Sequence, residues 1–123
     1  MKHDIDLTFK TIRVQQSSFL EFLASVYRFW AKADCAFMNC GNFRMDVYVK
    51  AGPITYGTLT NVIEDDIIVL LVPGKKIIDA LENCVSQYPN LSGRYSALSG
   101  IKFTWDCSRP QYKRVLKETI LIN

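Results

Sequence analysis

Apolar positions recur along the chain with two different periods, one typical of helices and one typical of strands. Between residues 17 and 31 they follow the helical period, which predicts a helix with one wide apolar face against a core. Ser17 or Ser18 is expected to cap this helix, because a hydroxyl can accept a hydrogen bond from a free backbone N–H. The predicted buried face consists of Phe19, Phe22, Leu23, Val26 and Trp30.

A second helix is predicted over residues 75–86, again from apolar residues at helical spacing. Its polar side chains Asp79, Glu82 and Asn83 are expected to point outward. Pro89 ends the segment, because proline cannot supply the N–H that a continuing helix needs. A shorter helix is predicted over residues 56–63.

The remaining apolar segments have the patterns of strands. Residues 67–72 form a continuous run rich in β-branched side chains, which predicts a strand covered on both faces. Alternation over 101–105 predicts a half-buried strand. Residues 35–38 and 115–122 complete the set. Helices and strands interleave without a linker or repeat, which predicts one mixed α/β domain over residues 1–123.

The composition is that of an ordinary soluble globular protein. The chain has 123 residues and a net charge of +3, with 49% hydrophobic residues. Lysine and arginine are scattered, so we expect no nucleic-acid partner. No apolar stretch is long enough to cross a bilayer, and the N-terminus is too polar for a secretory signal. We therefore expect a cytoplasmic protein without membrane contact.

The residues that could bind metal are few and badly spaced. Cys35, Cys40, Cys84 and Cys107 show no Cys-x-x-Cys spacing, and His3 is the only histidine. A structural zinc site needs four closely arranged nitrogen or sulfur ligands. We expect no metal or other cofactor, and reduced, mostly buried thiols.

Several longer motifs together point to a family. They comprise Ile12-Arg13, Ala33-Asp34, the Asn-x-Gly-x-x-Arg pattern at Asn39, Gly41 and Arg44, Gly-Pro-Ile-Thr-Tyr-Gly at 52–57, Ala-Leu-Glu-Asn-Cys-Val-Ser-Gln-Tyr-Pro at 80–89, and Ser-Gly-Ile-Lys-Phe-Thr-Trp-Asp-Cys-Ser-Arg-Pro at 99–110. In these motifs the chain resembles the C-terminal domain of the 5′-nucleotidase family. The resemblance runs from about residue 6 to residue 115. It implies a layered fold with helices packed on a mixed sheet.

The resemblance also implies a division of chemical work. In such enzymes a separate N-terminal domain binds two divalent metal ions that activate water and bind the phosphate, and this metallophosphatase domain is absent from the sequence. The C-terminal domain binds the nucleotide. Carried over to this chain, the nucleotide-binding residues are Asn39, Gly41 and Arg44. No catalytic residue and no metal ligand is expected here.

The sequence departs from the family where the nucleotide base would bind. Ile63-Glu64-Asp65 replaces a segment that supplies a stacking ring, and a carboxylate there repels phosphate. Gln16 replaces a glutamate, and Leu20-Glu21 replaces Gly-Asn. Tyr56, Tyr88 and Tyr95 could stack on a base, although packing is the simpler interpretation. The acidic residues 64–66 could bind a cation, although a solvated acidic loop is the simpler interpretation. Asp46 and Asp106 could form a catalytic carboxylate pair, but nothing in their spacing supports one.

Two hypotheses follow. In the first, which the sequence favours, the chain is a non-catalytic structural or interaction subunit with protein partners in a larger assembly, with a cytoskeletal or ciliary setting as the expectation. In the second, it is the substrate-recognition half of a nucleotide phosphohydrolase, either a fragment or a partner of a metal-binding domain. The sequence leaves enzymatic activity undecided and leans against it.

Overall fold

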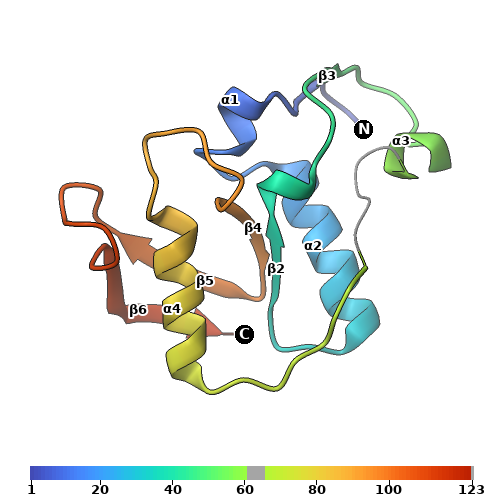
Figure 1. The fold of residues 1–123 in the computed structure, drawn as a ribbon. Coiled ribbons are helices and arrows are strands. Elements are labelled where there is room, and N and C mark those ends of the chain that lie inside the picture. The colour runs from blue at the N-terminus through green and yellow to red at the C-terminus, as the bar shows by residue number, and fades with distance from the viewer. Residues whose placement is uncertain (61–65, 123) are drawn as a thin grey trace.

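The computed structural model describes residues 1–60 and 66–122, which form helices interleaved with short strands (Figure 1). The helices are α1 (Phe9–Ile12), α2 (Ser18–Ala31), α3 (Tyr56–Thr60) and α4 (Gly74–Val85), with a 3₁₀ turn, η1, at Cys40–Asn42. The strands are β1 (Ile5–Asp6), β2 (Ala36–Asn39), β3 (Tyr48–Val49), β4 (Ser96–Ser99), β5 (Ile101–Trp105) and β6 (Val115–Ile122).

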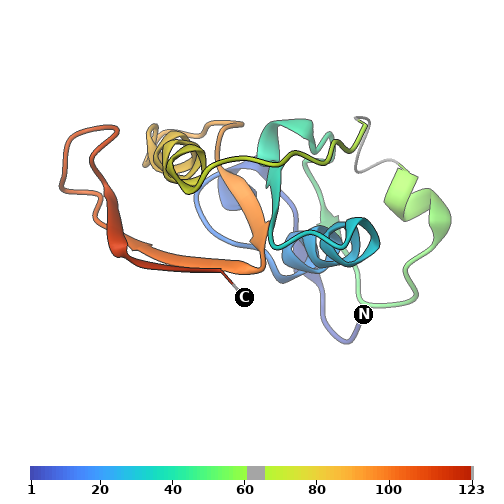
Figure 2. The same cartoon turned by 90° about the horizontal axis from the view of Figure 1, so that it is seen from below.

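The strands pair into three antiparallel sheets of two strands each. The pairs are β1 with β3, β2 with β4, and β5 with β6. The mixed α/β class is therefore confirmed, while the single mixed sheet that the resemblance implied is divided in the described residues. The β2–β4 pair runs between α2 and α4, and the β5–β6 hairpin extends away from it (Figures 1 and 2). Helix α2 packs on β2 and β4, whereas α4 contacts β6 of the hairpin.

Helix α2 has the predicted range but buries a different face. Phe19 and Leu23 are buried as predicted, and Leu20 and Ala24 are buried beside them. The predicted Phe22, Val26 and Trp30 are exposed instead, so the predicted face was wrong. The helix carries two overlapping apolar stripes, and the helical period is the same for both. Contact with β2 and β4 decides which stripe is covered. Ser17 stands at the N-cap position, but its side chain makes no capping hydrogen bond.

Helix α4 confirms the second predicted helix, with one correction at Glu82. This side chain was expected to point outward, yet it is 6% exposed. Its Oε2 accepts a hydrogen bond from Arg114 N at 3.0 Å, and its Oε1 accepts one from Val115 N at 3.0 Å. A buried carboxylate needs such partners, and they come from a strand about thirty residues away, which the local pattern does not reveal.

Arg114, which directly precedes β6, also binds the C-terminal end of α4. Its Nη1 donates to the carbonyl oxygens of Val85 at 2.7 Å, Ser86 at 3.1 Å and Tyr88 at 2.9 Å. The last carbonyls of a helix have no partner within the helix, and a cation stabilises that end. The β5–β6 hairpin is therefore joined to α4 by two reciprocal sets of polar contacts.

The largest correction concerns residues 67–72, which were predicted to be a buried strand. They belong to no strand, and all six side chains are exposed. The exposed fraction of the side chains runs from 40% at Val72 to 104% at Leu71. Such a strand needs paired strands at its edges and other elements packed on its two faces, and in the described residues this segment has no paired strand and its side chains are exposed. A continuous apolar run shows that a segment favours burial but does not show what buries it.

The other predicted elements are confirmed where the structure describes them. Strands β5 and β6 match their predicted ranges, and α3 matches the described part of the predicted 56–63 helix. Strand β2 begins and ends one residue later than predicted, and it is half-buried where a buried strand was expected. Cys40 and Cys84 are buried and Cys35 is half-buried, while Cys107 is exposed; none of the four forms a disulfide. No helix in the described residues combines the length and the apolar content needed to cross a membrane.

Candidate functional site

Two of the three predicted nucleotide-binding residues share an open cleft of about 580 Å³. Asn39 ends β2 and Gly41 lies in η1, and together they form one wall of the cleft. Residues of α4 and of the loop before β4 form the opposite wall. The lining consists of Phe37, Asn39, Gly41, Asn42, Ala80, Asn83, Ser92, Gly93, Arg94 and Ser96.

The η1 turn is held in place by the loop across the cleft. Cys40 N donates to Tyr95 O at 2.7 Å, and Gly41 N donates to Gly93 O at 2.9 Å. A Cβ atom on Gly93 would lie 2.7 Å from the Cα of Gly41, closer than real Cβ contacts. Gly41 is not among the positive-φ residues, so its backbone conformation does not explain why this position is glycine. The close approach of two backbones requires glycine here.

Side-chain amides provide hydrogen-bonding groups at the mouth of the cleft. Asn39 Nδ2 donates to Asn42 Oδ1 at 2.8 Å, which orients both amides. An amide carries both donors and acceptors, so each retains capacity beyond this bond. Asn39 is exposed, so its remaining groups are accessible to a ligand.

The cation of the cleft is not the predicted one. Arg44 is exposed and does not line the cleft. Arg94 lines the cleft instead, with Nη1 donating to Tyr112 Oη at 3.2 Å. No sequence motif singled out Arg94, and its only visible signal is its position directly after Gly93, which favours a turn. A guanidinium has five N–H donors, so this single bond leaves most of the fork for a ligand.

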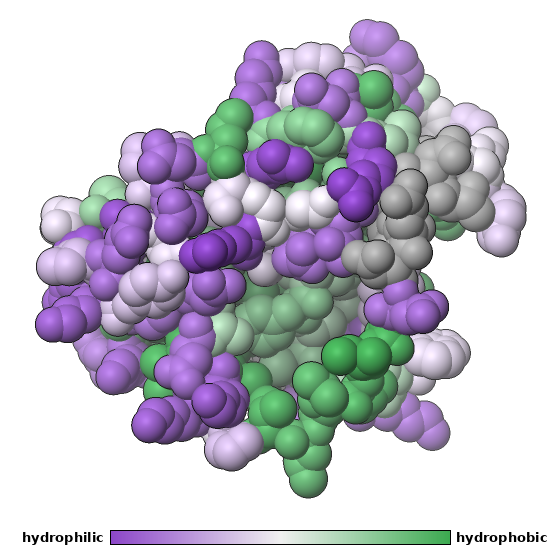
Figure 3. Space-filling model, in the orientation of Figure 1, coloured by the Kyte–Doolittle hydropathy of each residue, from purple (hydrophilic) through white to green (hydrophobic). Residues whose placement is uncertain are grey.

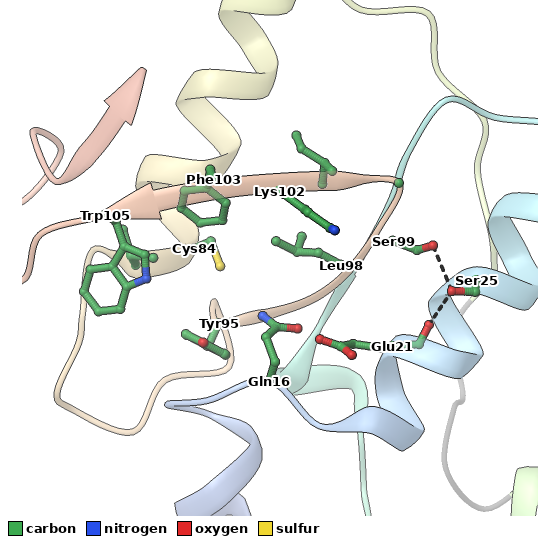
Figure 4. A pocket seen from close by; sticks show the side chains of 13 residues that line it. Gln16, Glu21, Ser25, Cys84, Tyr95, Leu98, Ser99, Lys102, Phe103 and Trp105 are labelled. Carbon is green, nitrogen blue, oxygen red and sulfur yellow. Dashed lines mark hydrogen bonds between the residues drawn. The ribbon is translucent and has the colours of Figure 1, made fainter. Parts of the chain in front are cut away.

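A second cavity of about 550 Å³ lies between the N-terminal half of α2, β4 and β5 (Figure 4). One end is polar, with Gln16, Glu21 and Lys102 pointing into it, and Ser25 Oγ lies 2.9 Å from Ser99 Oγ. The other end is aromatic and is formed by Tyr95, Phe103 and Trp105. None of the predicted nucleotide-binding residues lines this cavity.

The buried groups around these cavities are poor nucleophiles. Burial raises the pKa of Cys40 to about 12 and also raises the pKa of Cys84. Burial likewise raises the pKa of Tyr95 to about 12. Only the thiolate is a strong nucleophile, so these cysteines act as packing residues at neutral pH.

The predicted tyrosines and carboxylates have mostly structural surroundings. Tyr95 is buried, whereas Tyr56 is 82% exposed and away from the cleft. Tyr88 packs edge-on against Trp105 with ring centroids 4.8 Å apart. The carboxylates Asp46 and Asp106 both have structural partners. Asp46 accepts a hydrogen bond from Phe9 N at the start of α1, 37 residues away in the sequence, and Asp106 accepts two from Ser108 in a local turn.

The described residues do not fit a two-metal centre. No group of three or more His, Cys, Asp or Glu side chains gathers among residues 1–60 and 66–122. Of the acidic residues at 64–66, only Asp66 lies within the described residues, and it is exposed. The cleft offers amides, hydroxyls and a guanidinium, which bind an anion rather than a divalent cation.

Comparison with known proteins agrees with the motifs. The profile of the family described as "5'-nucleotidase, C-terminal domain" matches residues 2–123. Among solved structures, the 5'-nucleotidase precursor from Thermus thermophilus is similar, with a TM-score of 0.77 and 26% identity. That match covers 98% of this chain and 26% of the other, so this chain spans about a quarter of its length. A search of curated proteins finds no match. The chain belongs to the family of the 5′-nucleotidase C-terminal domain.

Proposed function

We propose that this chain recognises the phosphate-bearing part of a nucleotide, as the substrate-recognition domain of a 5′-nucleotidase-type phosphohydrolase. One observation carries the proposal. Asn39 and Gly41, which belong to the Asn-x-Gly-x-x-Arg motif, line the same open cleft as Arg94.

The charge of the cleft supports an anionic ligand. Its described lining residues include one cation, Arg94, and no acidic residue. A guanidinium matches the oxygens of a phosphate with two parallel hydrogen bonds, and such charge-assisted bonds are about twice as strong as neutral ones. The amides of Asn39 and Asn83 can add bonds to a phosphate, a ribose or a base edge.

The chemical step itself would belong to another domain. Two divalent ions in such enzymes activate water and polarise the phosphate, and the residues described here do not form that centre. The contribution of this chain is therefore to bind and orient the substrate. The similar Thermus thermophilus protein is named a 5'-nucleotidase precursor and is longer, which supports this division.

Binding measurements with variants test the proposal. Titration of the chain with AMP and with inorganic phosphate, followed by calorimetry or NMR shifts, should show saturable binding. Arg94→Ala should weaken it about tenfold or more, since a hydrogen bond to a charged group contributes about 1.5–3 kcal/mol. Lys102→Ala is the matched control, because it removes a cation from the other cavity. Equal losses in both variants, or no binding at all, would contradict the proposal.

The second candidate is an interaction subunit of a cytoplasmic assembly, including a cytoskeletal or ciliary one. The observation that favours it is the outward apolar side of α2, where Phe29 is 87% exposed and Trp30 is 71% exposed. Large apolar side chains exposed together often mark a protein interface. Protection of Trp30 fluorescence from quenching in the native complex, with no nucleotide binding, would support this candidate over the first.

A further inference from the structure

The second cavity, between the N-terminal half of α2, β4 and β5, has no part in the proposed function. Its volume of about 550 Å³ falls within the range of about 300–1,000 Å³ that is usual for small-molecule sites. Such sites combine apolar and aromatic walls with a few polar groups that orient the ligand. This cavity has that composition, since one end is aromatic and the other carries charged side chains (Figure 4).

Two opposite charges face the polar end from different elements. Glu21 comes from α2 and Lys102 from β5, and Figure 4 shows both side chains pointing into the cavity. Among residues 1–60 and 66–122, neither of the two groups forms an ion pair. Both are exposed, so both are accessible to a ligand. A ligand with one charge would be attracted by one of them and repelled by the other, whereas a ligand with one charge of each sign matches both.

Gln16 adds a neutral acceptor to the same end of the cavity. Its Nε2 donates to Ser96 O at 2.8 Å, which fixes the orientation of the amide. The amide oxygen is a hydrogen-bond acceptor, as is the carboxylate of Glu21, and an ammonium group has three N–H donors. These two acceptors therefore favour the ammonium group of a ligand, while the ammonium group of Lys102 favours its carboxylate.

The opposite end of the cavity favours an aromatic group. Tyr95, Phe103 and Trp105 form this end. Aromatic rings attract one another in edge-to-face and offset arrangements, in addition to what they gain from the burial of apolar surface. The ligand that matches the whole cavity therefore carries both charges at one end and a ring at the other.

We propose that this cavity binds a small zwitterion with an aromatic group, that is, a free aromatic amino acid. The ammonium group of the ligand contacts Glu21 and Gln16, its carboxylate contacts Lys102, and its ring lies against Phe103 and Trp105. A nucleotide matches the cavity less well, because Glu21 repels a phosphate. The inference goes beyond the proposed function and does not depend on it.

The cavity is separate from the exposed apolar surface of the molecule. Figure 3 shows strongly hydrophobic residues gathered along the lower edge, where residues 67–72 run toward α4 in Figure 1. None of these six residues lines the cavity. An apolar compound could adsorb to them without any charged contact, so a test of the cavity has to follow the two charges of the ligand as well as its ring.

NMR titration of the chain with L-phenylalanine tests the site. We expect saturable shifts at the backbone amides of Phe103 and Trp105. Two analogues separate the charges, because phenethylamine lacks the carboxylate and phenylpropionate lacks the ammonium group. Each analogue should bind about threefold to tenfold more weakly than L-phenylalanine, since each loses one charge-assisted contact at an exposed position.

Variants assign each charge of the ligand to its partner. Glu21→Gln should weaken L-phenylalanine binding about threefold to tenfold without weakening phenylpropionate, which has no ammonium group. Lys102→Gln should weaken L-phenylalanine to a similar extent without weakening phenethylamine, which has no carboxylate. Lys117→Gln is the control, because Lys117 lies on the same hairpin, is exposed and does not line the cavity.

Four results would overturn the proposal. They are no saturable binding, shifts confined to residues 67–72, a variant that weakens L-phenylalanine and both analogues alike, and a loss in Lys117→Gln as large as that in Lys102→Gln. The proposed function is tested separately, with AMP and phosphate in Arg94→Ala. Either proposal can therefore fail without the other.

Discussion

The buried carboxylate of Glu82 is expected to contribute strongly to the stability of the fold. Its two oxygens accept hydrogen bonds from the backbone N–H groups of Arg114 and Val115 at 3.0 Å each. Both N–H groups are buried with it, because Glu82 is 6% exposed, Arg114 9% and Val115 4%. Removing the carboxylate therefore leaves two buried donors without partners.

The cost can be worked out for two substitutions. Glu82→Gln keeps the shape but only one acceptor oxygen, so one donor loses its partner, which costs about 1–3 kcal/mol. Glu82→Ala removes both acceptors and costs about 2–6 kcal/mol on the same basis. Domains of this size have total stabilities of about 5–15 kcal/mol. The alanine variant is therefore expected to be marginally folded at best.

Urea denaturation followed by tryptophan fluorescence measures this effect, because Trp105 lies on the β5 strand of the hairpin that Glu82 holds. Asp79→Asn is the control, because Asp79 lies on the same helix, is exposed and forms a surface pair with Lys76 at 3.7 Å. Its free energy of unfolding should change by less than about 0.5 kcal/mol. A Glu82→Gln variant no less stable than Asp79→Asn would refute the reasoning.

Two further predictions concern the turn at the cleft and Asp6 of strand β1. Gly93→Ala should lower the free energy of unfolding by about 1–3 kcal/mol, because its Cβ would lie 2.7 Å from the Gly41 Cα. Thermal melting measures this loss. Gly74→Ala is the control, because a Cβ at Gly74 would meet no atom within 4 Å. Hydrogen bonds, first that from the Thr8 hydroxyl, lower the pKa of Asp6 from 3.8 to about 2. Asp6 therefore stabilises the fold above about pH 4, and this contribution is lost as the pH falls through about 2. Asp6→Asn should thus be less stable than wild type at pH 7, and the gap should close between pH 4 and pH 2 in acid titrations; a constant gap would contradict this.

The candidate cleft could be predicted only in part. The motif singled out Asn39 and Gly41, and in the structure both line one cleft. The same motif suggested Arg44, but Arg94 provides the guanidinium there, from a loop more than fifty residues away from Asn39. A motif records spacing along the chain, whereas a cleft is formed by whatever the fold brings across from it. The residues proposed to interrupt base stacking, Glu64 and Asp65, lie outside the described residues.

The sequence alone determined the type and place of the main elements. The helices at 17–31 and 75–86 and the strands at 101–105 and 115–122 follow from periods set by local backbone geometry. Tertiary structure determined which stripe of α2 is buried, that Glu82 is buried, and that residues 67–72 are exposed. Each of these outcomes depends on partners distant in the sequence or on a partner that no described residue provides. Local periodicity encodes conformation, but burial is a property of the contacts that the whole fold makes.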